Sequence, residues 1–284
     1  MEKPEPTMYK FLILFCLVSC LLACASRDLK HPVPVSQGNG SPSPISPSQS
    51  PSPTPHVNRE ELALASGLRI VRREINLTND KRRYKISVAY PEIEGHSNKW
   101  SSVLNREIKR LVTKTYQWLL QRPTKDELLQ HSKWSGVFNS VDMEYDVVEA
   151  NDRFLSIYFM GYHYGIGAAH SVHESFTVNY DLQTNQILTF TSLFKSKSQV
   201  LKLISKTCLE ELTKSVPYLS EDSSFADRLK PKTKNFESWN LTARGLMVNF
   251  DACEVAACAE GDVQVEISFV QLTEISRPGS VLIM

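Results

Sequence analysis

The sequence predicts an α+β fold in which one or two mainly antiparallel sheets pack with two main helices, after a disordered Pro/Ser linker. Three observations carry this prediction. Strand-like segments with alternating apolar residues follow one another, two amphipathic helices lie apart from each other, and a Ser/Pro-rich segment precedes them all. Runs of neighbouring strands with separated helices favour an antiparallel sheet, whereas regular alternation of strand and helix would favour a parallel one.

The first residues resemble a bacterial lipoprotein signal. Lys10 precedes an apolar run that ends in Leu-Leu-Ala-Cys at Cys24. The run is about a dozen residues long, whereas a spanning helix needs roughly 20. We therefore predict a signal peptide over residues 1–23 and lipidation of Cys24, which would anchor the exported protein in the membrane. Two alternatives stay open, namely cleavage before Cys20 and an ordinary secretory signal cut near Ala25.

Residues 24–58 form the predicted linker. Its Ser/Pro alternation leaves too little apolar surface to offset the entropy of ordering. A Pro-rich chain of this kind favours extended polyproline II, so about 23 residues reach roughly 70 Å from the membrane. We expect the domain to be exported to the cell envelope. Ala25, rather than Asp, follows Cys24, as in lipoproteins of the Gram-negative outer membrane, so that membrane is favoured if the source is Gram-negative.

Charge and length limit the class of protein. Lys and Arg number 32 against 31 Asp and Glu, and the net charge is +1. A nucleic-acid partner is therefore not expected, because such partners select a basic surface. About 225 residues remain after the linker, enough for one large or two small domains. We predict an N-terminal sub-domain at residues 59–135 and a C-terminal one at 136–284.

The first half of the body reads as strands around one long helix. Residues 83–90 alternate apolar and polar side chains, as in a strand that buries one face. Residues 98–120 place apolar side chains three and four positions apart, which is typical of a helix packed on a core. The polar residues 149–152 have hairpin-turn chemistry. The predicted strands are residues 68–77, 83–90, 137–149 and 154–164.

The second half repeats the mixture of strands with one helix. Residues 184–186 are turn residues between two strands, and residues 198–215 form the second amphipathic helix. Cys208 lies on the apolar side of that helix, so we expect it to be core rather than reactive. The predicted strands are residues 171–181, 187–190, 237–241, 246–250 and 263–269.

Three cysteines, Cys208, Cys253 and Cys258, remain in the body. An envelope compartment is oxidising, so a disulfide is plausible, and Cys253 and Cys258 are the closest pair in sequence. The alternative is that both are small buried hydrophobes. Because no CxxC or nearby His provides metal-ligand spacing around them, we assign no zinc site there.

Several motifs resemble a known family. Residues 162–171 (YHYGIGAAHS) resemble a GGAH-type loop, and residues 178–184 (VNYDLQT) match an "nYDL" pattern. Gly245–Phe250 and Glu254–Ala256, with Gly261 after them, resemble the family's C-terminal motif. The chain thus resembles the domain of unknown function 3298 family, with a 4163-type N-terminal half. Such paired domains occur in the extracytoplasmic part of a lysozyme-sensing anti-sigma factor and beside the catalytic domain of a cell-wall polysaccharide deacetylase.

The resemblance carries expectations about fold and partners. It implies an α+β fold, an envelope-facing position, and lysozyme or peptidoglycan as the candidate ligand. Cys253 and Cys258 stand where the family commonly has tyrosines, which makes a local disulfide more attractive. The sequence shows no deacetylase domain and no cytoplasmic sigma-binding segment, so neither activity is carried over.

The candidate ligand-binding residues lie between His163 and Glu174. Glycines permit sharp turns or a close approach to a ligand, and histidines transfer protons or bind metals near neutral pH. On a strand, His170 and His173 would face opposite sides, so a shared metal site would need an irregular loop. We assign no catalytic residue, no metal and no cofactor. The candidate residues are His163, Tyr164, Gly165, Gly167, His170, His173 and Glu174.

Three functional hypotheses follow. The first is a non-catalytic binding or sensing module that faces the cell wall. The alternative is a small envelope hydrolase that acts on cell-wall glycan through His170 with Glu174 or Asp181, although capping a turn is the simpler role for Asp181. The third is a structural lipoprotein that assembles through an exposed sheet edge. The sequence contains no Gly-x-Ser-x-Gly elbow, so we expect binding rather than catalysis.

Overall fold

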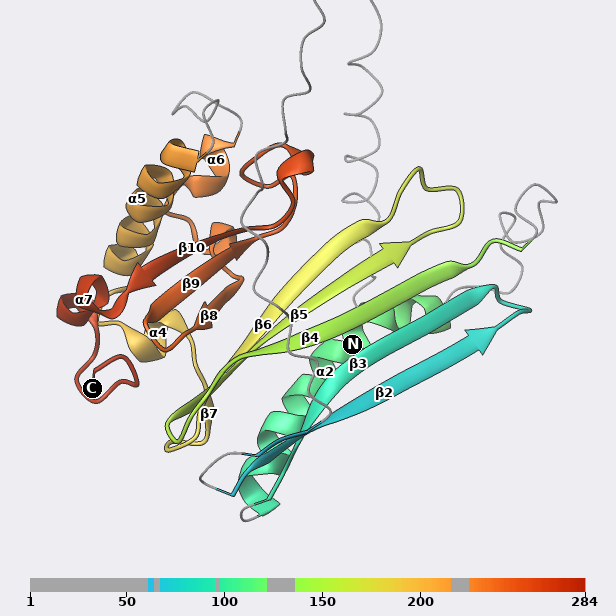
Figure 1. Ribbon diagram of the computed structural model, residues 1–284, viewed down its shortest axis with the longest axis horizontal. Helices are drawn as coiled ribbons and strands as arrows, with labels where there is room; N and C mark the ends of the chain where they lie inside the picture. Colours follow the sequence, from blue (N-terminus) through green and yellow to red (C-terminus); the bar gives the residue numbers. More distant parts are fainter. Residues whose placement is uncertain (1–60, 64–66, 96–97, 122–135, 216–224, 284) are drawn as a thin grey trace, which may run out of the picture. The chain divides into compact units, whose positions relative to one another are not determined.

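The computed structural model describes residues 61–63, 67–95, 98–121, 136–215 and 225–283 (Figure 1). These residues form a seven-stranded sheet, a three-stranded sheet and two long helices, so the predicted α+β class is confirmed. The predicted signal peptide, the lipidation site and the linker lie outside the described residues. Among the helices that are described, none combines the length and apolar character needed to cross a bilayer.

The strands of the seven-stranded sheet are neighbours in the same order as they occur along the chain. Its neighbours pair antiparallel except β3 and β4, which run parallel. Parallel strands need a long crossover, which the helix α2 (Asn98–Gln121) supplies. The strands are β1 (Glu61–Ala63), β2 (Arg69–Asn79), β3 (Tyr84–Glu94), β4 (Asn139–Ala150), β5 (Phe154–Tyr164), β6 (Val172–Asp181) and β7 (Gln186–Ile187).

Helix α2 packs against this sheet through its apolar stripe (Figure 1). Ile108 and Val112 have no exposed surface, and Leu104 and Leu119 are each only 1% exposed. Burying each such side chain stabilises the fold by about 1.5–3 kcal/mol. The amide side chain of Asn105 accepts a hydrogen bond from the Ile93 backbone N and donates one to its O, which fastens the helix to the end of β3.

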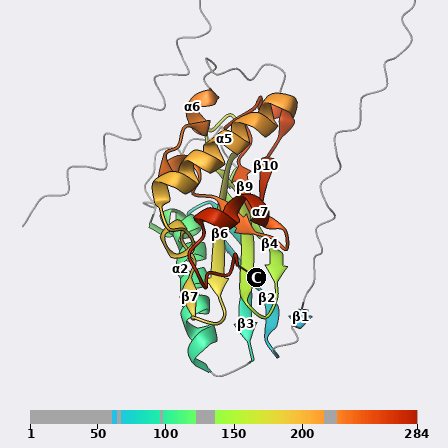
Figure 2. The ribbon, with the colours of Figure 1, turned by 90° about the vertical axis from the view of Figure 1, so that its left-hand side faces the viewer.

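The three-stranded sheet has the order β10-β9-β8 and is antiparallel throughout. Helix α5 (Lys197–Ser215) packs beside it, and Val200, Ile204 and Cys208 are buried in the shared core (Figure 2). The strands are β8 (Trp239–Leu241), β9 (Gly245–Phe250) and β10 (Val263–Ser268), and the short helices are α4 (Phe190–Leu193), α6 (Ala226–Leu229), α7 (Phe269–Leu272), η2 (Thr233–Asn235), η3 (Cys258–Glu260) and η4 (Thr273–Ile275).

A buried polar network joins the two sheets. Asn179 of β6 accepts hydrogen bonds from Ser156 Oγ (2.7 Å) and from the Leu241 backbone N (3.1 Å), and its amide donates to the Trp239 backbone O (2.7 Å). Asn240 of β8 donates to Ser156 Oγ at 2.8 Å. Buried polar groups are tolerated when they are satisfied in this way, so the network fixes how β8 lies against β5 and β6.

Two segments differ from the sequence expectation. The predicted strand at 187–190 ends at Ile187, and helix α4 begins at Phe190. The reason is a capping box, in which Thr189 and Ser192 satisfy each other's backbone N–H. Strand β3 continues through Pro91 to Glu94. Strand β4 pairs with β3 only over Tyr84–Val88, so β3 is an edge strand on that side at Pro91, and a proline without an N–H is tolerated at an edge.

The seven-stranded sheet has strands on both sides of residue 135, where we predicted the boundary between two sub-domains. That division concerns which segments fold independently, so it stays a prediction.

Candidate functional site

The candidate residues lie at one end of the β5–β6 hairpin. Strand β5 ends at Tyr164 and β6 begins at Val172, with Gly165 and Gly167 in the connecting loop. Buried Asn139 anchors the loop, because its side-chain O accepts a hydrogen bond from the Ile166 backbone N at 2.9 Å. Gly167 has a φ of +92°, a conformation that glycine adopts readily and that side chains disfavour.

His163 and Glu174 form an ion pair across the hairpin. His163 Nε2 lies 2.6 Å from Glu174 Oε2, with 18% and 50% of the respective side chains exposed. The contact is an ion pair when the imidazole is protonated. The adjacent imidazole holds the pKa of Glu174 below its usual value, against the burial that raises it, and Lys114 of α2 adds a weaker attraction.

His173 faces a different set of partners. Its Nδ1 lies 3.5 Å from Asp251 Oδ1 and 3.4 Å from Asp262 Oδ1. Asp251 directly follows β9, and Asp262 directly precedes β10, so both come from the connection between these strands. The ring of Tyr162 lies 4.9 Å from the His173 ring, centroid to centroid. The ligand atoms of His173, Asp251 and Asp262 all lie within 4.8 Å of one another, as metal ligands do.

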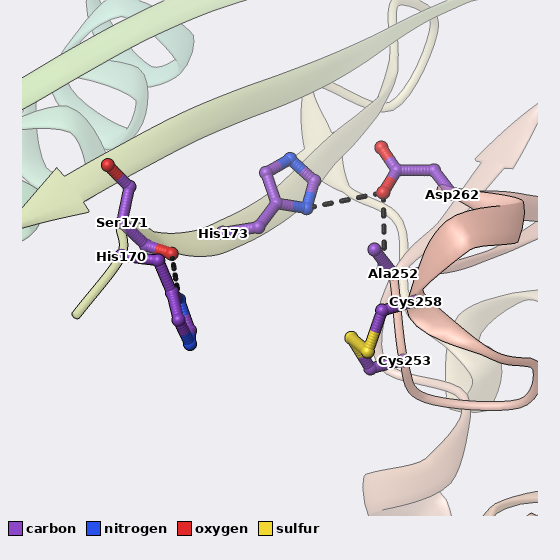
Figure 3. Close-up of a disulfide and its surroundings, with 7 residues drawn as sticks. All are labelled: His170, Ser171, His173, Ala252, Cys253, Cys258 and Asp262. Carbon is purple, nitrogen blue, oxygen red and sulfur yellow. Dashed lines mark hydrogen bonds and ion pairs between the residues drawn. A yellow bond between two sulfur atoms is a disulfide. The ribbon is translucent and has the colours of Figure 1, made fainter.

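His170 is apart from both groups. It is exposed, and its Nδ1 contacts the backbone O of the adjacent Ser171 at 2.9 Å (Figure 3). Asp181 lies at the far end of β6, about 30 Å away at the usual rise per residue, and caps a turn, as predicted, by accepting from the backbone N of Gln183 and Thr184. Glu174 pairs with His163, and among the described residues no hydrogen bond or ion pair joins His170 to Glu174 or Asp181, as the hydrolase hypothesis would need.

The cysteines of the body have distinct environments. Cys253 and Cys258 form a disulfide in the β9–β10 connection (Figure 3). Cys208 is a buried free thiol in α5, and burial raises its pKa to about 12. A thiol with so high a pKa is a poor nucleophile, so Cys208 is a core residue.

Two large apolar side chains are exposed next to the candidate residues. Tyr162 is 52% exposed and Val172 is 61% exposed. Tyr162 pairs with His173 and Val172 pairs with His163 in the β5–β6 ladder, so the two side chains stand on opposite faces at the same end of the hairpin. We call Tyr162, Val172 and the loop 165–171 the hairpin tip.

A surface hollow of about 390 Å³ lies elsewhere, between β6, α4 and η2. Its lining includes Thr177, Phe190, Phe236 and Trp239, and none of the predicted site residues. The hollow is therefore separate from the hairpin tip.

Sequence reasoning placed all three histidines in one loop site and missed Asp251 and Asp262. The two aspartates are distant from His173 in sequence, and they come close through the pairing of β9 with β10 and the packing of β8, the neighbour of β9, beside β6. The two aspartates flank the cysteine pair in the sequence, which could have marked them as candidate ligands. The spacing along the chain does not indicate that His173 is their partner.

Two family models match the chain. Residues 77–173 match the model described as Deacetylase PdaC, and residues 191–270 match the model of a protein of unknown function, DUF3298. No curated protein matches the chain.

The comparison with solved structures found proteins of the DUF3298 family. A DUF3298 family member from Bacteroides fragilis aligns with a TM-score of 0.50 at 14% identity, over 75% of this chain and 96% of its own. A DUF3298 family protein from Pseudomonas aeruginosa aligns with a TM-score of 0.47 at 14% identity, over 74% of this chain and 94% of its own. The family matches fit an envelope-associated module of unknown function. The resemblance that the motifs predict is confirmed: one segment of the chain matches the DUF3298 model, and the segment before it matches the PdaC model.

Proposed function

We propose that this protein is a lipid-anchored envelope protein whose α+β body is a non-catalytic binding or sensing module facing the cell wall. The lipoprotein-like signal with Cys24 and the Pro/Ser-rich residues 24–58 support the anchor and the reach. Export to the envelope, at the outer membrane if the source is Gram-negative, belongs to the same proposal. The two family matches support an envelope role of the body.

The observation that carries the binding role is the hairpin tip. Tyr162 and Val172 each expose apolar surface at the end of a paired hairpin, one on each face of the sheet. Tyrosine is enriched in protein interfaces because it gives a large contact area with few rotatable bonds. The hairpin is anchored through Asn139, so the tip is presented by a well-ordered scaffold.

The ligand class follows from the family. The lysozyme-sensing anti-sigma factor and the deacetylase both act at the cell wall, so lysozyme and peptidoglycan are the two ligands that we propose to test. The geometry favours binding over hydrolysis, since His170 is separate from Glu174 and from Asp181.

The experiment is a pull-down of the full chain, purified in detergent, on immobilised lysozyme and on insoluble peptidoglycan. Soluble muropeptide release is measured in the same tubes. We expect retention on one of the two matrices without release of muropeptides. Absence of retention on both would overturn the binding proposal, and release of muropeptides above the buffer level would replace it with the hydrolase alternative.

A further inference from the structure

We propose that His173, Asp251 and Asp262 form a binding site for a divalent transition-metal cation, through Nδ1 of the histidine and Oδ1 of each aspartate. We call these residues the His–Asp–Asp cluster. The inference goes beyond the proposed function, since none of the three residues belongs to the hairpin tip and the site needs no cell-wall ligand.

The spacing of the ligand atoms fits a metal ion. Nδ1 of His173 lies 3.5 Å from Asp251 Oδ1 and 3.4 Å from Asp262 Oδ1, and all three atoms lie within 4.8 Å of one another. Zn²⁺ holds imidazole nitrogen and carboxylate oxygen at about 2.0–2.2 Å, and tetrahedral ligands at that radius stand about 3.4 Å apart. The two His–Asp separations thus equal the edge of such a tetrahedron.

Three polar atoms of the cluster are buried without hydrogen bonds. Both ring nitrogens of His173 and Oδ1 of Asp251 are buried and have no hydrogen-bond partner among the described residues. The His–Asp separations exceed the 3.2 Å of an ordinary N–H···O bond. Leaving buried polar groups unpaired is unfavourable, and coordination of a cation would satisfy Nδ1 and the carboxylate oxygens together.

The β9–β10 connection holds the two aspartates in place. The Cys253–Cys258 disulfide closes a small ring between them (Figure 3). Oδ1 of Asp262 accepts a hydrogen bond from the Ala252 backbone N at 3.0 Å. This bond joins the start of the β9–β10 connection to its end. Ligands that are fixed before binding lose little entropy on coordination.

The cluster also has a route for the ion. The Asp262 side chain is 39% exposed, whereas the side chains of His173 and Asp251 are 11% and 24% exposed. A cation could therefore enter past Asp262 and keep a water as its fourth ligand, as in zinc sites with three protein ligands. One imidazole with two carboxylates suits Zn²⁺, whereas Mg²⁺ and Ca²⁺ prefer all-oxygen sites.

The test is a calorimetric titration of Zn²⁺ into the metal-free full chain in detergent. The variants are His173→Ala and Asp251→Asn, and the matched control is His170→Ala, which removes an exposed histidine from the same hairpin. Loss of an outer partner costs 10–100-fold in metal affinity, so loss of a direct ligand should weaken binding by more than about 100-fold. We expect the control to bind as wild type does.

Circular dichroism checks that each variant is folded, and Asp251→Asn keeps the side-chain shape if His173→Ala does not fold. The two cluster variants keep every cysteine and every histidine except His173, so zinc bound elsewhere on the chain would still bind to them. Absence of saturable Zn²⁺ binding by wild type would overturn the proposal and leave an ion pair between His173 and the aspartates. Equal Zn²⁺ affinity of wild type and both cluster variants would overturn it as well.

Discussion

His163 and His173 lie on adjacent strands of one hairpin, yet they have different partners. Tyr162 is the register partner of His173, and Val172 is that of His163, so the two histidines are offset by one position and face opposite sides of the sheet. His163 therefore contacts Glu174, whereas His173 reaches Asp251 and Asp262. The sequence predicted the residue types of the site but not this division between two faces.

The Glu174 carboxylate provides a prediction about pH. Its pKa is lowered in the folded state by His163, so the ionised form contributes stability above the ordinary glutamate pKa of 4.5, and the contribution is lost as pH falls through the lowered value. Glu174→Gln should therefore lower the melting temperature at pH 6, and the difference from wild type should shrink as the pH falls below 4.5. The effect is expected to be small, because half of the side chain is exposed and solvent screens the pair.

Thermal unfolding of wild type and Glu174→Gln from pH 3 to pH 7 measures this difference. Glu237→Gln, at another exposed glutamate, is the control and should show a smaller dependence on pH. A difference between wild type and Glu174→Gln that is the same at every pH would contradict the role given to the ion pair.

At the scale of elements, periodicity predicted the long segments well. The predicted strand 154–164 and β5 have the same bounds, and the predicted helix 98–120 is α2 within one residue. These elements bury one continuous face, so their pattern is strong. The parallel pairing of β3 with β4 was not predicted. The residues of the two strands do not indicate that the chain returns through a helix and places β4 parallel to β3.

Short elements depended on side-chain contacts that periodicity does not capture. Helix α4 replaces part of the predicted strand 187–190, and its capping box uses the hydroxyls of Thr189 and Ser192. Serine and threonine offer the backbone such local hydrogen bonds, so one turn of helix can form within an apolar segment.

The junction between β6 and β8 provides a prediction about stability. Asn179 is 3% exposed and makes three hydrogen bonds, two of them across this junction to Trp239 and Leu241 and one to Ser156 of β5. Asn179→Ala removes them and leaves the buried Trp239 carbonyl and Leu241 N–H with fewer partners. We expect the free energy of unfolding to fall by about 2–3 kcal/mol, since each buried unsatisfied group costs about 1–3 kcal/mol.

Urea denaturation of the full chain measures this loss. Asn76→Ala, at an exposed asparagine of β2, should change the free energy of unfolding by less than about 0.5 kcal/mol. An Asn179→Ala variant as stable as Asn76→Ala would show that the polar network does not hold the two sheets together.

At the scale of the whole molecule, the candidate site combines segments from both sheets. The β5–β6 hairpin supplies the hairpin tip and His173, and the β9–β10 connection supplies the aspartates and the disulfide. The family motifs predicted the hairpin as the place to look. They could not predict the cluster behind it, because Asp251 and Asp262 become neighbours of His173 only through tertiary packing.

The central claim is that the hairpin tip binds an envelope ligand, and a calorimetric titration of the full chain tests it most directly. Lysozyme and soluble muropeptides are titrated separately into wild type, a Tyr162→Ala/Val172→Ser variant and a Val270→Ser control, in which an exposed valine of α7 is changed. We predict saturable binding of one ligand by wild type and by the control, and binding at least about tenfold weaker by the tip variant, a loss of about 1.4 kcal/mol. Equal affinity of all three proteins, or no binding of either ligand by wild type, would contradict the claim.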